Sequence, residues 1–118
     1  MAKAPTAKHT LMIVDDEPSQ RKRIGGFFEA FGFTIIELES AEEMLDSLSR
    51  HAADMILLDV RLPKMSGIDA LPRLREILPT VPVILITAYA DVRQAVAAVK
   101  SGADDYLSKP IDLEELKV

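Results

Sequence analysis

Short apolar segments recur along the sequence at residues 11–14, 34–38, 55–58 and 83–87. In three of these segments the apolar residues do not alternate with polar ones, so both faces of the segment are apolar. This pattern is typical of the central strands of a parallel sheet that helices cover on both sides. A weaker segment at residues 105–108 predicts a fifth strand.

Segments of helical periodicity lie between the predicted strands, and several have recognisable ends. Ser40 followed by Glu43 is a capping box that starts one helix. Asp91 can cap a later helix, which Gly102 ends. The apolar stripes that the spacing predicts are Ile24, Phe27, Phe28 and Phe31 in the first helix, before Gly32; Ala41, Met44, Leu45 and Leu48 in the second; Leu71, Leu74, Ile77 and Leu78 in the third, before Pro79; and Val92, Val96 and Val99 in the fourth.

Two predicted helices contain residues that disfavour helix. Gly25 and Gly26 in the first helix cost about 1 kcal/mol each relative to alanine, and we interpret them as a weak helix rather than as close packing. Pro72 lies beyond the first turn of the third helix if Ser66 caps it, so we expect a kink or a later start there.

Strands that alternate with helices predict an α/β fold, a doubly wound sheet of five parallel strands joined by right-handed crossovers. The 118 residues are enough for one domain. We expect residues 1–9 to form a flexible N-terminal tail and residues 10–118 to form the domain. The last helical segment, residues 113–117, is shorter than the usual helix of about three turns. We therefore expect a truncated last helix and a domain excised from a longer protein.

Composition excludes several classes of function. The chain has no cysteine, which excludes disulfide scaffolds, thiolate metal sites and cysteine nucleophiles. A net charge of −5 disfavours direct binding of DNA or RNA. No apolar run approaches the roughly 20 residues that cross a bilayer, and the first residues lack the apolar core of a signal peptide. We therefore expect a cytoplasmic protein without membrane contact.

Polar residues follow the predicted strands at the end where an open parallel sheet binds its ligands. Each one alone has an ordinary explanation, such as a helix cap, a solvated turn acid or a surface lysine. Two adjacent carboxylates that face a third are different, because like charges at close range cost energy unless a cation joins them. The residues are Asp15 and Asp16 after the first strand, Asp59 after the third, Thr87 at the end of the fourth and Lys109 after the fifth.

Together these residues suit phosphoryl chemistry with a divalent ion. Three carboxylates supply oxygen ligands for Mg²⁺, which also opposes the charge of about −2 that three aspartates and one lysine carry at reference pKa values. A threonine hydroxyl and a lysine ammonium can then hold phosphoryl oxygens. We interpret Asp59 as the nucleophile, because it stands apart from the acid pair.

Four segments stand in a characteristic order and spacing: residues 13–17 (IVDDE), 57–67 (LLDVRLPKMSG), 86–89 (ITAY) and 102–110 (GADDYLSKP). Through them, residues 10–118 resemble the receiver domain of two-component response regulators. The resemblance implies a flavodoxin-like strand order of 2-1-3-4-5 with helices on both faces. It also implies a phosphoacceptor signalling domain that assists its own phosphorylation and dephosphorylation rather than an enzyme.

The resemblance implies a role for each acidic candidate. Asp59 accepts a phosphoryl group from a sensor histidine kinase or a phosphotransfer protein, which gives an acyl phosphate. Mg²⁺ is the implied cofactor, and its ligands are Asp15, Asp16, Asp59 and the backbone carbonyl of Arg61. Within the acid pair, Asp16 is the more direct ligand.

The remaining candidates contact the phosphoryl group or report its presence. Thr87 and the amide of Ala88 bind it, and Lys109 pairs first with the phosphoacceptor and then with phosphoryl oxygens. The bond from Lys109 to Pro110 is expected to be cis, as in the family. When Thr87 turns toward the phosphoryl group, Tyr106 can enter the vacated space, and the readout surface is the fourth helix, fifth strand and fifth helix. In the inactive state we expect the hydroxyl of Tyr106 to lie in water.

Residues 87–112 resemble more narrowly the nitrogen-regulatory (NtrC-like) group of transcriptional regulators, in which the receiver precedes an ATPase and a helix-turn-helix domain. This implies transcription control as the output and is compatible with a phosphorylation-dependent homodimer. We interpret the basic run at residues 21–23 as a solvated face, with kinase docking as the alternative. His9 and His51 are expected to be exposed, and Arg61 and Tyr89 flank the site and can tune the phosphate lifetime.

Three other functions remain as alternatives. A hydrolase of the haloacid dehalogenase type needs a second aspartate two residues after the nucleophile, where this chain has Arg61. A nucleotide or flavin domain needs a glycine-rich or Ser/Thr-rich turn after the first strand, where this chain has DDEPS. A free-standing phosphate shuttle would share the receiver chemistry but have no output domain.

Overall fold

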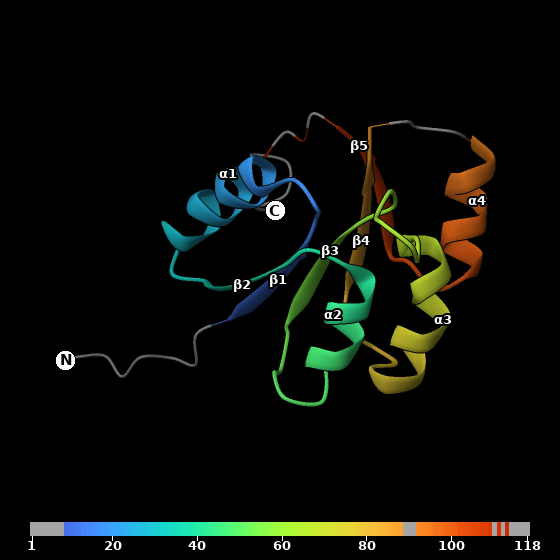
Figure 1. Ribbon diagram of the computed structural model, residues 1–118, viewed down its shortest axis with the longest axis horizontal. Coiled ribbons are helices and arrows are strands. Elements are labelled where there is room, and N and C mark those ends of the chain that lie inside the picture. Colours follow the sequence, from blue (N-terminus) through green and yellow to red (C-terminus); the bar gives the residue numbers. More distant parts are fainter. Residues whose placement is uncertain (1–8, 89–91, 110, 112, 114–118) are drawn as a thin grey trace.

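A computed structural model describes residues 9–88, 92–109, 111 and 113 of the chain. The described part contains one sheet of five parallel strands in the order β2-β1-β3-β4-β5, which confirms the predicted fold and strand order (Figure 1). The strands are β1 (Thr10–Val14), β2 (Thr34–Leu38), β3 (Met55–Asp59), β4 (Val83–Thr87) and β5 (Asp105–Ser108).

Helices cover both faces of this sheet, as predicted. One face carries α1 (Pro18–Glu29), and the other carries α2 (Ala41–Ser47), α3 (Gly67–Ile77) and α4 (Val92–Lys100) (Figure 1). Leu113, from the predicted last helix, packs against the α1 side. Several expectations concern residues outside the described part: residues 1–8 of the tail, Tyr89, Asp91, Pro110 and residues 114–117.

The central strands are apolar throughout because each of their faces belongs to a different core. Met12 and Val14 of β1 pack in the core under α2, α3 and α4. Leu11 and Ile13 point the other way, into the core under α1. Strands β1, β3 and β4 are central, whereas β2 and β5 form the edges. The absence of alternation therefore marked the strands that are buried on both sides.

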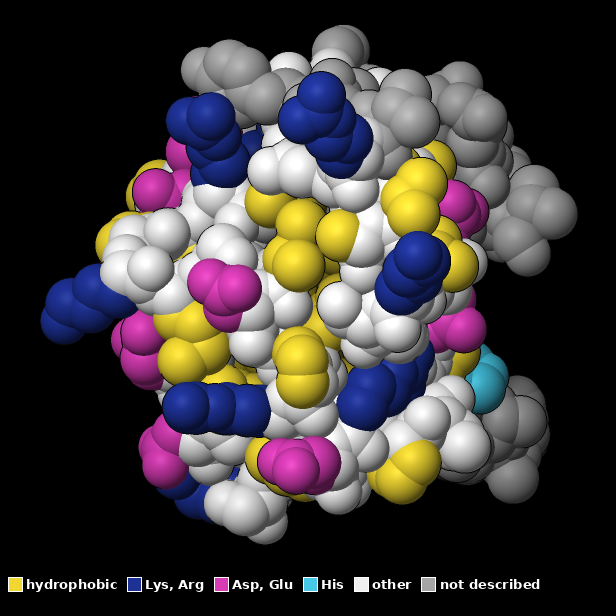
Figure 2. All heavy atoms as spheres, turned by 90° about the vertical axis from the view of Figure 1, so that its right-hand side faces the viewer, with side chains coloured by type: hydrophobic (Ala, Val, Ile, Leu, Met, Phe, Trp, Pro, Cys, Tyr) yellow, Lys and Arg dark blue, Asp and Glu magenta, His cyan; other side chains and the backbone are white. Residues whose placement is uncertain are grey.

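Four residues of the predicted apolar stripes are exposed, which corrects the extent of those stripes. Phe31 is 55% exposed, because α1 ends at Glu29 and Phe31 lies in the following turn. Ile77 is the last residue of α3, and it is exposed too. On α4, Val96 and Val99 face outward and Ala98 is the buried residue. Periodicity identifies residues that share a helix face, but not whether another element covers that face. Figure 2 shows the side of the molecule on which α4 lies in Figure 1, and there hydrophobic side chains lie among basic and acidic ones.

The two glycines of α1 differ, and our interpretation is wrong for one of them. A Cβ atom at Gly25 would lie 3.2 Å from Cγ2 of Ile35, so this glycine lets α1 pack closely on β2. A Cβ atom at Gly26 would meet nothing within 4 Å among the described residues, so it only weakens the helix.

The predicted cap at Ser40 is confirmed, whereas the predicted cap at Asp91 lies outside the described residues. The Oγ of Ser40 accepts from the amide of Glu43 at 3.1 Å, and the Glu43 carboxylate reaches back to the amide of Glu39. We expected a kink or a later start from Pro72; Ser66 caps α3 directly, so the later start is wrong and Pro72 lies inside the helix.

The basic run at residues 21–23 is not uniformly solvated. Lys22 and Arg23 are exposed, as expected, but Arg21 is only 9% exposed, so its place on a solvated face is wrong. Its guanidinium has partners in the turn after β1 and on β2, which the sequence pattern did not reveal. His9 and His51 are both exposed, as predicted.

Candidate functional site

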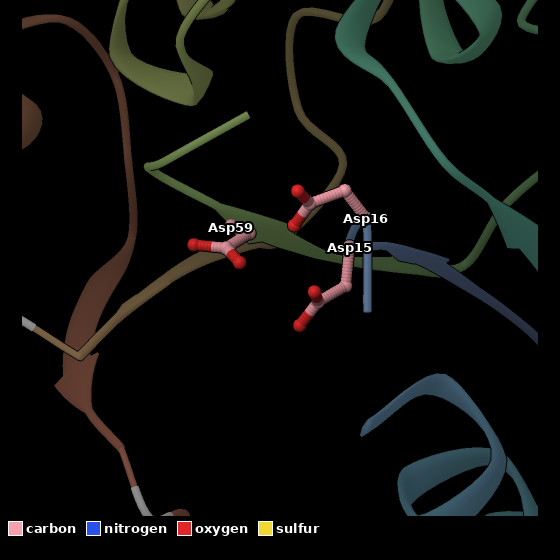
Figure 3. Close-up of side chains that lie close together, drawn as sticks. All are labelled: Asp15, Asp16 and Asp59. Atoms are coloured by element: carbon pink, nitrogen blue, oxygen red, sulfur yellow. The ribbon is translucent and has the colours of Figure 1, made fainter. Parts of the chain in front are cut away.

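Three aspartates meet at the carboxyl edge of the sheet (Figure 3). Asp15 and Asp16 follow β1, and Asp59 is the last residue of β3, which pairs with β1 through Val14 and Leu58. One carboxylate oxygen from each aspartate lies within 4.8 Å of the others. Asp15 and Asp59 are buried, whereas Asp16 is exposed at the rim. Parallel pairing of β1 with β3 therefore creates the acidic cluster.

Lys109 supplies the positive charge of this cluster. Its ammonium nitrogen lies 3.0 Å from Oδ2 of Asp59, 3.1 Å from Oδ2 of Asp15 and 3.2 Å from Oε1 of Glu17. The lysine side chain is only 11% exposed. Sequence reasoning gave Glu17 no role, although its place beside the acid pair was the available signal. One cation thus faces two buried carboxylates and one at the surface.

Backbone amides fix the orientation of the two buried carboxylates. Oδ1 of Asp59 accepts from the amide of Arg61 at 3.1 Å, and Oδ1 of Asp15 accepts from the amide of Glu17 at 2.9 Å. In each aspartate the other oxygen bonds Lys109. Neither side chain can rotate without losing a charge-assisted hydrogen bond, so the site is preorganised.

Burial and the contacts between Asp59, Asp15 and Lys109 together shift the pKa values of Asp59 and Lys109. Burial raises the pKa of Asp59 to about 6; the hydrogen bond from Lys109 opposes this shift and the charge of Asp15 adds to it. Burial alone would lower the pKa of Lys109, but its hydrogen bonds to Asp59 and Asp15 outweigh burial and raise that pKa. At neutral pH the Lys109 ammonium is charged, and Asp59 is mostly a carboxylate whose negative charge is destabilised by burial.

The ends of β4 and β5 complete the rim. Thr87 is fully buried at the end of β4, and its carbonyl accepts from the amide of Lys109 at 2.7 Å. Beside it, a pocket of about 360 Å³ opens to the solvent. Its lining includes residues from all four of the segments on which the family resemblance rests. They are Asp16, Glu17, Asp59, Arg61, Ala88 and Lys109.

Gly67 brings the start of α3 against the end of β3. A side chain at Gly67 would collide with the backbone carbonyl of Asp59, and the Gly67 amide donates to the carbonyl of Val60 at 2.9 Å. In the loop between them, Lys64 adopts a left-handed backbone with φ of 66°. Gly67 belongs to the segment 57–67 on which the family resemblance rests. Only the structure shows that it lies directly against the backbone of Asp59.

Tyr106 lies on β5, half-buried, and contacts α4. Its hydroxyl lies 3.0 Å from Oε1 of Gln94, to which it donates a hydrogen bond. The expectation of a hydroxyl in water is therefore wrong, because α4 presents an acceptor. This hydrogen bond links β5 to α4, on which Val96 and Val99 are exposed.

The donor set of the cluster fits a hard divalent cation. Mg²⁺ prefers a few carboxylates together with waters and phosphate oxygens, and Asp15, Asp16 and Asp59 offer carboxylate oxygens close together. The pocket beside them is large enough for a phosphoryl group and bounded by a lysine. Among the described helices, none is long and apolar enough to span a membrane.

Comparison with known proteins agrees with this geometry. The family model described as "Response regulator receiver domain" matches residues 11–118. The regulatory protein AtoC of Escherichia coli K12 is 40% identical over 113 residues, which are 96% of this chain and 24% of AtoC. The transcriptional regulator NtrC of Klebsiella pneumoniae is 39% identical over 103 residues, which are 87% of this chain and 22% of NtrC. The chain thus spans about a quarter of the length of these relatives.

Solved structures are similar over most of the chain. A receiver domain protein from Methanospirillum hungatei has a TM-score of 0.90 and 26% identity, with 94% of this chain and 89% of that chain covered. A response regulator from Burkholderia pseudomallei, solved with a phosphorylated aspartic acid, a calcium ion and citrate, has a TM-score of 0.88 and 26% identity. That match covers 93% of this chain and 65% of the other.

Proposed function

Because this chain belongs to the response regulator receiver domain family, as the match over residues 11–118 shows, we propose that Asp59 is its phosphoacceptor. The chain is a receiver domain of two-component response regulators and is homologous to NtrC-like transcriptional regulators. One observation carries the residue assignment. Asp59 is the buried carboxylate that lines the open pocket beside Lys109, whereas Asp15, which has similar contacts, does not line it.

The proposed reaction is a phosphoryl transfer to a carboxylate oxygen. A carboxylate oxygen of Asp59 attacks the phosphorus of a phosphohistidine, the P–N bond breaks, and the imidazole leaves with the electron pair and takes up a proton. The product is an acyl phosphate. The raised pKa of Asp59 favours the reaction, because a destabilised carboxylate is a better nucleophile and loses its strained charge on bond formation.

A metal ion fits beside the reacting oxygen. We assign its ligands as Asp15, Asp16, Asp59 and the backbone carbonyl of Arg61. Mg²⁺ held there would neutralise negative charge on the acids and on the incoming phosphoryl group. Asp16 is the exposed member of the trio, and no hydrogen bond to its carboxylate is found in the part of the chain that the structure describes. This supports Asp16 as the more direct ligand of the acid pair.

Lys109, Thr87 and Ala88 are assigned to the phosphoryl group. Lys109 already lies 3.0 Å from Asp59, so its ammonium can move from the carboxylate to a phosphoryl oxygen by a small displacement. Ala88 lines the same pocket, and its small side chain leaves the amide accessible. Thr87 is at the end of the neighbouring strand, where rotation would bring its hydroxyl toward the pocket.

Thr87 and Tyr106 form the proposed switch. In the register between β4 and β5, Tyr106 pairs with Leu85, two residues before Thr87. The bond of the Tyr106 hydroxyl to Gln94 ties the strand to α4, where Val96 and Val99 leave apolar surface exposed. Phosphorylation would favour the state in which Tyr106 turns inward and α4 changes its surface, by differential contacts with two existing states.

The wider role follows from the family and its relatives. Receiver domains take phosphate from histidine kinases, so a sensor kinase or a phosphotransfer protein is the proposed partner. Transcription control is the proposed output, since NtrC is a DNA-binding transcriptional regulator. We further propose a regulatory rather than enzymatic role, a cytoplasmic location, domain limits of 10–118 after a tail of 1–9, and no direct contact of this domain with nucleic acid. A phosphorylation-dependent homodimer is compatible with the exposed α4 face.

Intact-protein mass spectrometry after treatment with acetyl phosphate and Mg²⁺ tests the assignment. One phosphoryl group should add to the parent protein and none to Asp59→Asn, because the amide lacks the nucleophilic oxygen. Asp46→Asn is the matched control, since Asp46 is an exposed aspartate on α2 whose carboxylate pairs with Arg50. Labelling of the Asp59 variant equal to that of the control would remove Asp59 as the phosphoacceptor.

A further inference from the structure

Arg21 is a buried cation that contacts the backbone of Asp15, whereas Lys109 contacts its carboxylate. Its side chain is 11% exposed on α1, and it bonds one group just after β1 and another on β2. One guanidinium nitrogen, Nη1, donates to the backbone carbonyl of Asp15 at 2.6 Å. The other, Nε, donates to Oε1 of Glu37 on β2 at 3.1 Å. The phosphorylation chemistry described above does not use this residue.

The carbonyl that Arg21 binds has a special place in the site. It belongs to the peptide unit that joins Asp15 to Asp16, and this unit is planar, with both Cα atoms in its plane. On the other side of Asp15, its amide donates to the carbonyl of Leu38 at 3.0 Å. Fixing the Asp15 carbonyl therefore fixes the plane from which both carboxylate side chains project.

Further contacts of α1 hold the same turn. The amide of Arg21 donates to the carbonyl of Glu17 at 3.2 Å, and the amide of Gln20 donates to it at 3.1 Å. Arg21 thus hydrogen-bonds both ends of the turn from Asp15 to Glu17. Its guanidinium bonds Asp15 and its backbone amide bonds Glu17. A charge-assisted bond of this kind is stronger than a neutral one.

Glu37 keeps the guanidinium in place and offsets its charge. It lies on β2 in register with Ile13, and its two oxygens accept from Arg21 and, at 3.4 Å, from the exposed Lys22. Gly25 allows this arrangement, because it brings α1 close to β2 beside Glu37. Because Glu37 offsets the charge of Arg21, the electrostatic effect of Arg21 on Asp15 and Asp16 is small. Arg21 acts on them mainly by orienting the Asp15 carbonyl through its hydrogen bond.

We propose that Arg21 is a positioning residue for the cation site, which holds the Asp15–Asp16 peptide so that both carboxylates meet Asp59. The inference rests on the proposed function, since it concerns the same cation. Two physical roles for Arg21 predict opposite results. If its charge mattered alone, its removal would tighten Mg²⁺ binding by relieving repulsion. If it positions the peptide, its removal weakens Mg²⁺ binding, as loss of groups that orient ligands does.

Calorimetric titration with MgCl₂ distinguishes these roles. Arg21→Met and Arg21→Lys should each weaken Mg²⁺ binding about tenfold. Lysine keeps the charge but cannot donate from a planar fork to two partners, so it should not rescue. Arg23→Met is the matched control: Arg23 is exposed on the same helix, with a bond at 3.4 Å to Gln20, and its removal should leave affinity unchanged or slightly tighter.

A second variant and a second measurement guard against a merely structural effect. Glu37→Gln keeps the size of the acceptor but weakens its hold on the guanidinium, so it should weaken Mg²⁺ binding by a smaller factor while the fold remains. The amide NMR signal of Asp16, which lies in the clamped peptide, should shift in the Arg21 variants without metal and stay unshifted in Arg23→Met. Lower thermal stability alone would move neither the affinity of the folded protein nor this one signal selectively.

The outcomes separate this inference from the proposed function. If the parent protein binds no Mg²⁺, the proposed function fails, and the inference with it. If the parent binds Mg²⁺ and is labelled on Asp59, but the Arg21 variants bind Mg²⁺ as tightly or more tightly, only the role of Arg21 is overturned.

Discussion

Two partly buried cations at opposite ends of the sheet show how the same kind of charge serves different purposes. Lys109, at the carboxyl end, bonds the carboxylates of Asp15, Glu17 and Asp59. Arg75 of α3, near the start of β4, has a side chain that is 17% exposed. Its partners are mainly backbone carbonyls: Gly102 at 2.7 and 2.9 Å, Val81 at 2.6 Å and Leu78 at 3.2 Å, with the carboxylate of Asp104 at 2.9 Å.

The difference lies in what each set of partners can do. Backbone carbonyls neither titrate nor carry net charge, so Arg75 and Asp104 form a neutral junction that joins α3 to the turns before β4 and β5. Around Lys109 the acids outnumber the cation, which leaves negative charge for a divalent ion to balance. Both regions contain a partly buried cation. The junction around Arg75 and the reactive site around Lys109 therefore differ in the charge of the groups that accept hydrogen bonds from that cation.

Arg75→Ala tests the structural side of this comparison and should have the largest effect. Its loss leaves the carbonyls of Gly102 and Val81 without their donor, so we expect the free energy of unfolding to fall by about 3 kcal/mol. Urea denaturation with and without MgCl₂ measures this. Because the junction lies away from the acids, Mg²⁺ should not restore the lost stability selectively, and a selective restoration would contradict the comparison.

Lys109→Ala should cost somewhat less, and its effect should depend on Mg²⁺. Without metal, Asp15 and Asp59 lose their buried counter-charge, and we expect a loss of about 2 kcal/mol. Mg²⁺ can replace that positive charge, so its binding should persist and should recover most of the stability. Phosphorylation should no longer change the environment of Tyr106, which fluorine NMR of a fluorotyrosine-labelled protein can follow. A normal response of Tyr106 would discard the coupling role of Lys109.

Asp59→Asn should make the metal-free protein more stable, by about 1 kcal/mol at pH 7. The pKa of Asp59 is raised to about 6, so the folded state prefers the protonated form. The contribution of this group to stability is therefore full below about pH 4 and is lost as pH rises through 6. Thermal unfolding from pH 4 to 7 should show this decline in the parent protein and a smaller one in the asparagine variant. Equal slopes would mean that another group causes the decline.

The smallest expected effect is a shift in the titration of Asp59 itself. Carboxyl carbon NMR of the metal-free protein should give a midpoint near pH 6, because burial disfavours the charged form. Adding Mg²⁺ should lower the midpoint, whereas Lys109→Ala should raise it, since the lysine hydrogen bond stabilises the carboxylate. A midpoint near the ordinary value of 3.8 in the metal-free protein would remove the electrostatic strain assigned to this site.

Local sequence patterns predicted the residues of the site better than the residues that hold the surrounding elements in position. Asp15, Asp16 and Asp59 were found because parallel strands bring their carboxyl ends to one edge, so position along the strand was sufficient. Arg21 and Glu37 could not be paired from the sequence, because helical spacing alone suggested a solvated basic run. The same limit applies to Arg75, whose partner Gly102 is distant in the chain. Long side chains choose partners by spatial neighbourhood, which periodicity does not describe.

Helix faces show the same limit for apolar residues. Met44, Leu71 and Leu74 were predicted within apolar stripes and are buried. Val96 and Val99 fit a stripe equally well, yet both are exposed on α4, where Ala98 contacts the core. The spacing of valines is the same whether a face meets the sheet or the solvent, so only the packing of α4 could decide.

By itself, the sequence determined which segments are strands and helices, the identity of the acids and the lysine, and the sheet edge at which they gather. These depend on local periodicity and on the direction of parallel strands, both of which are written along the chain. The tertiary structure decided which oxygen each cation binds, that Glu17 shares Lys109, that Arg21 clamps the Asp15–Asp16 peptide and that Gln94 accepts from Tyr106. Such contacts join residues from separate elements, and they exist only once packing has set the distances between those elements.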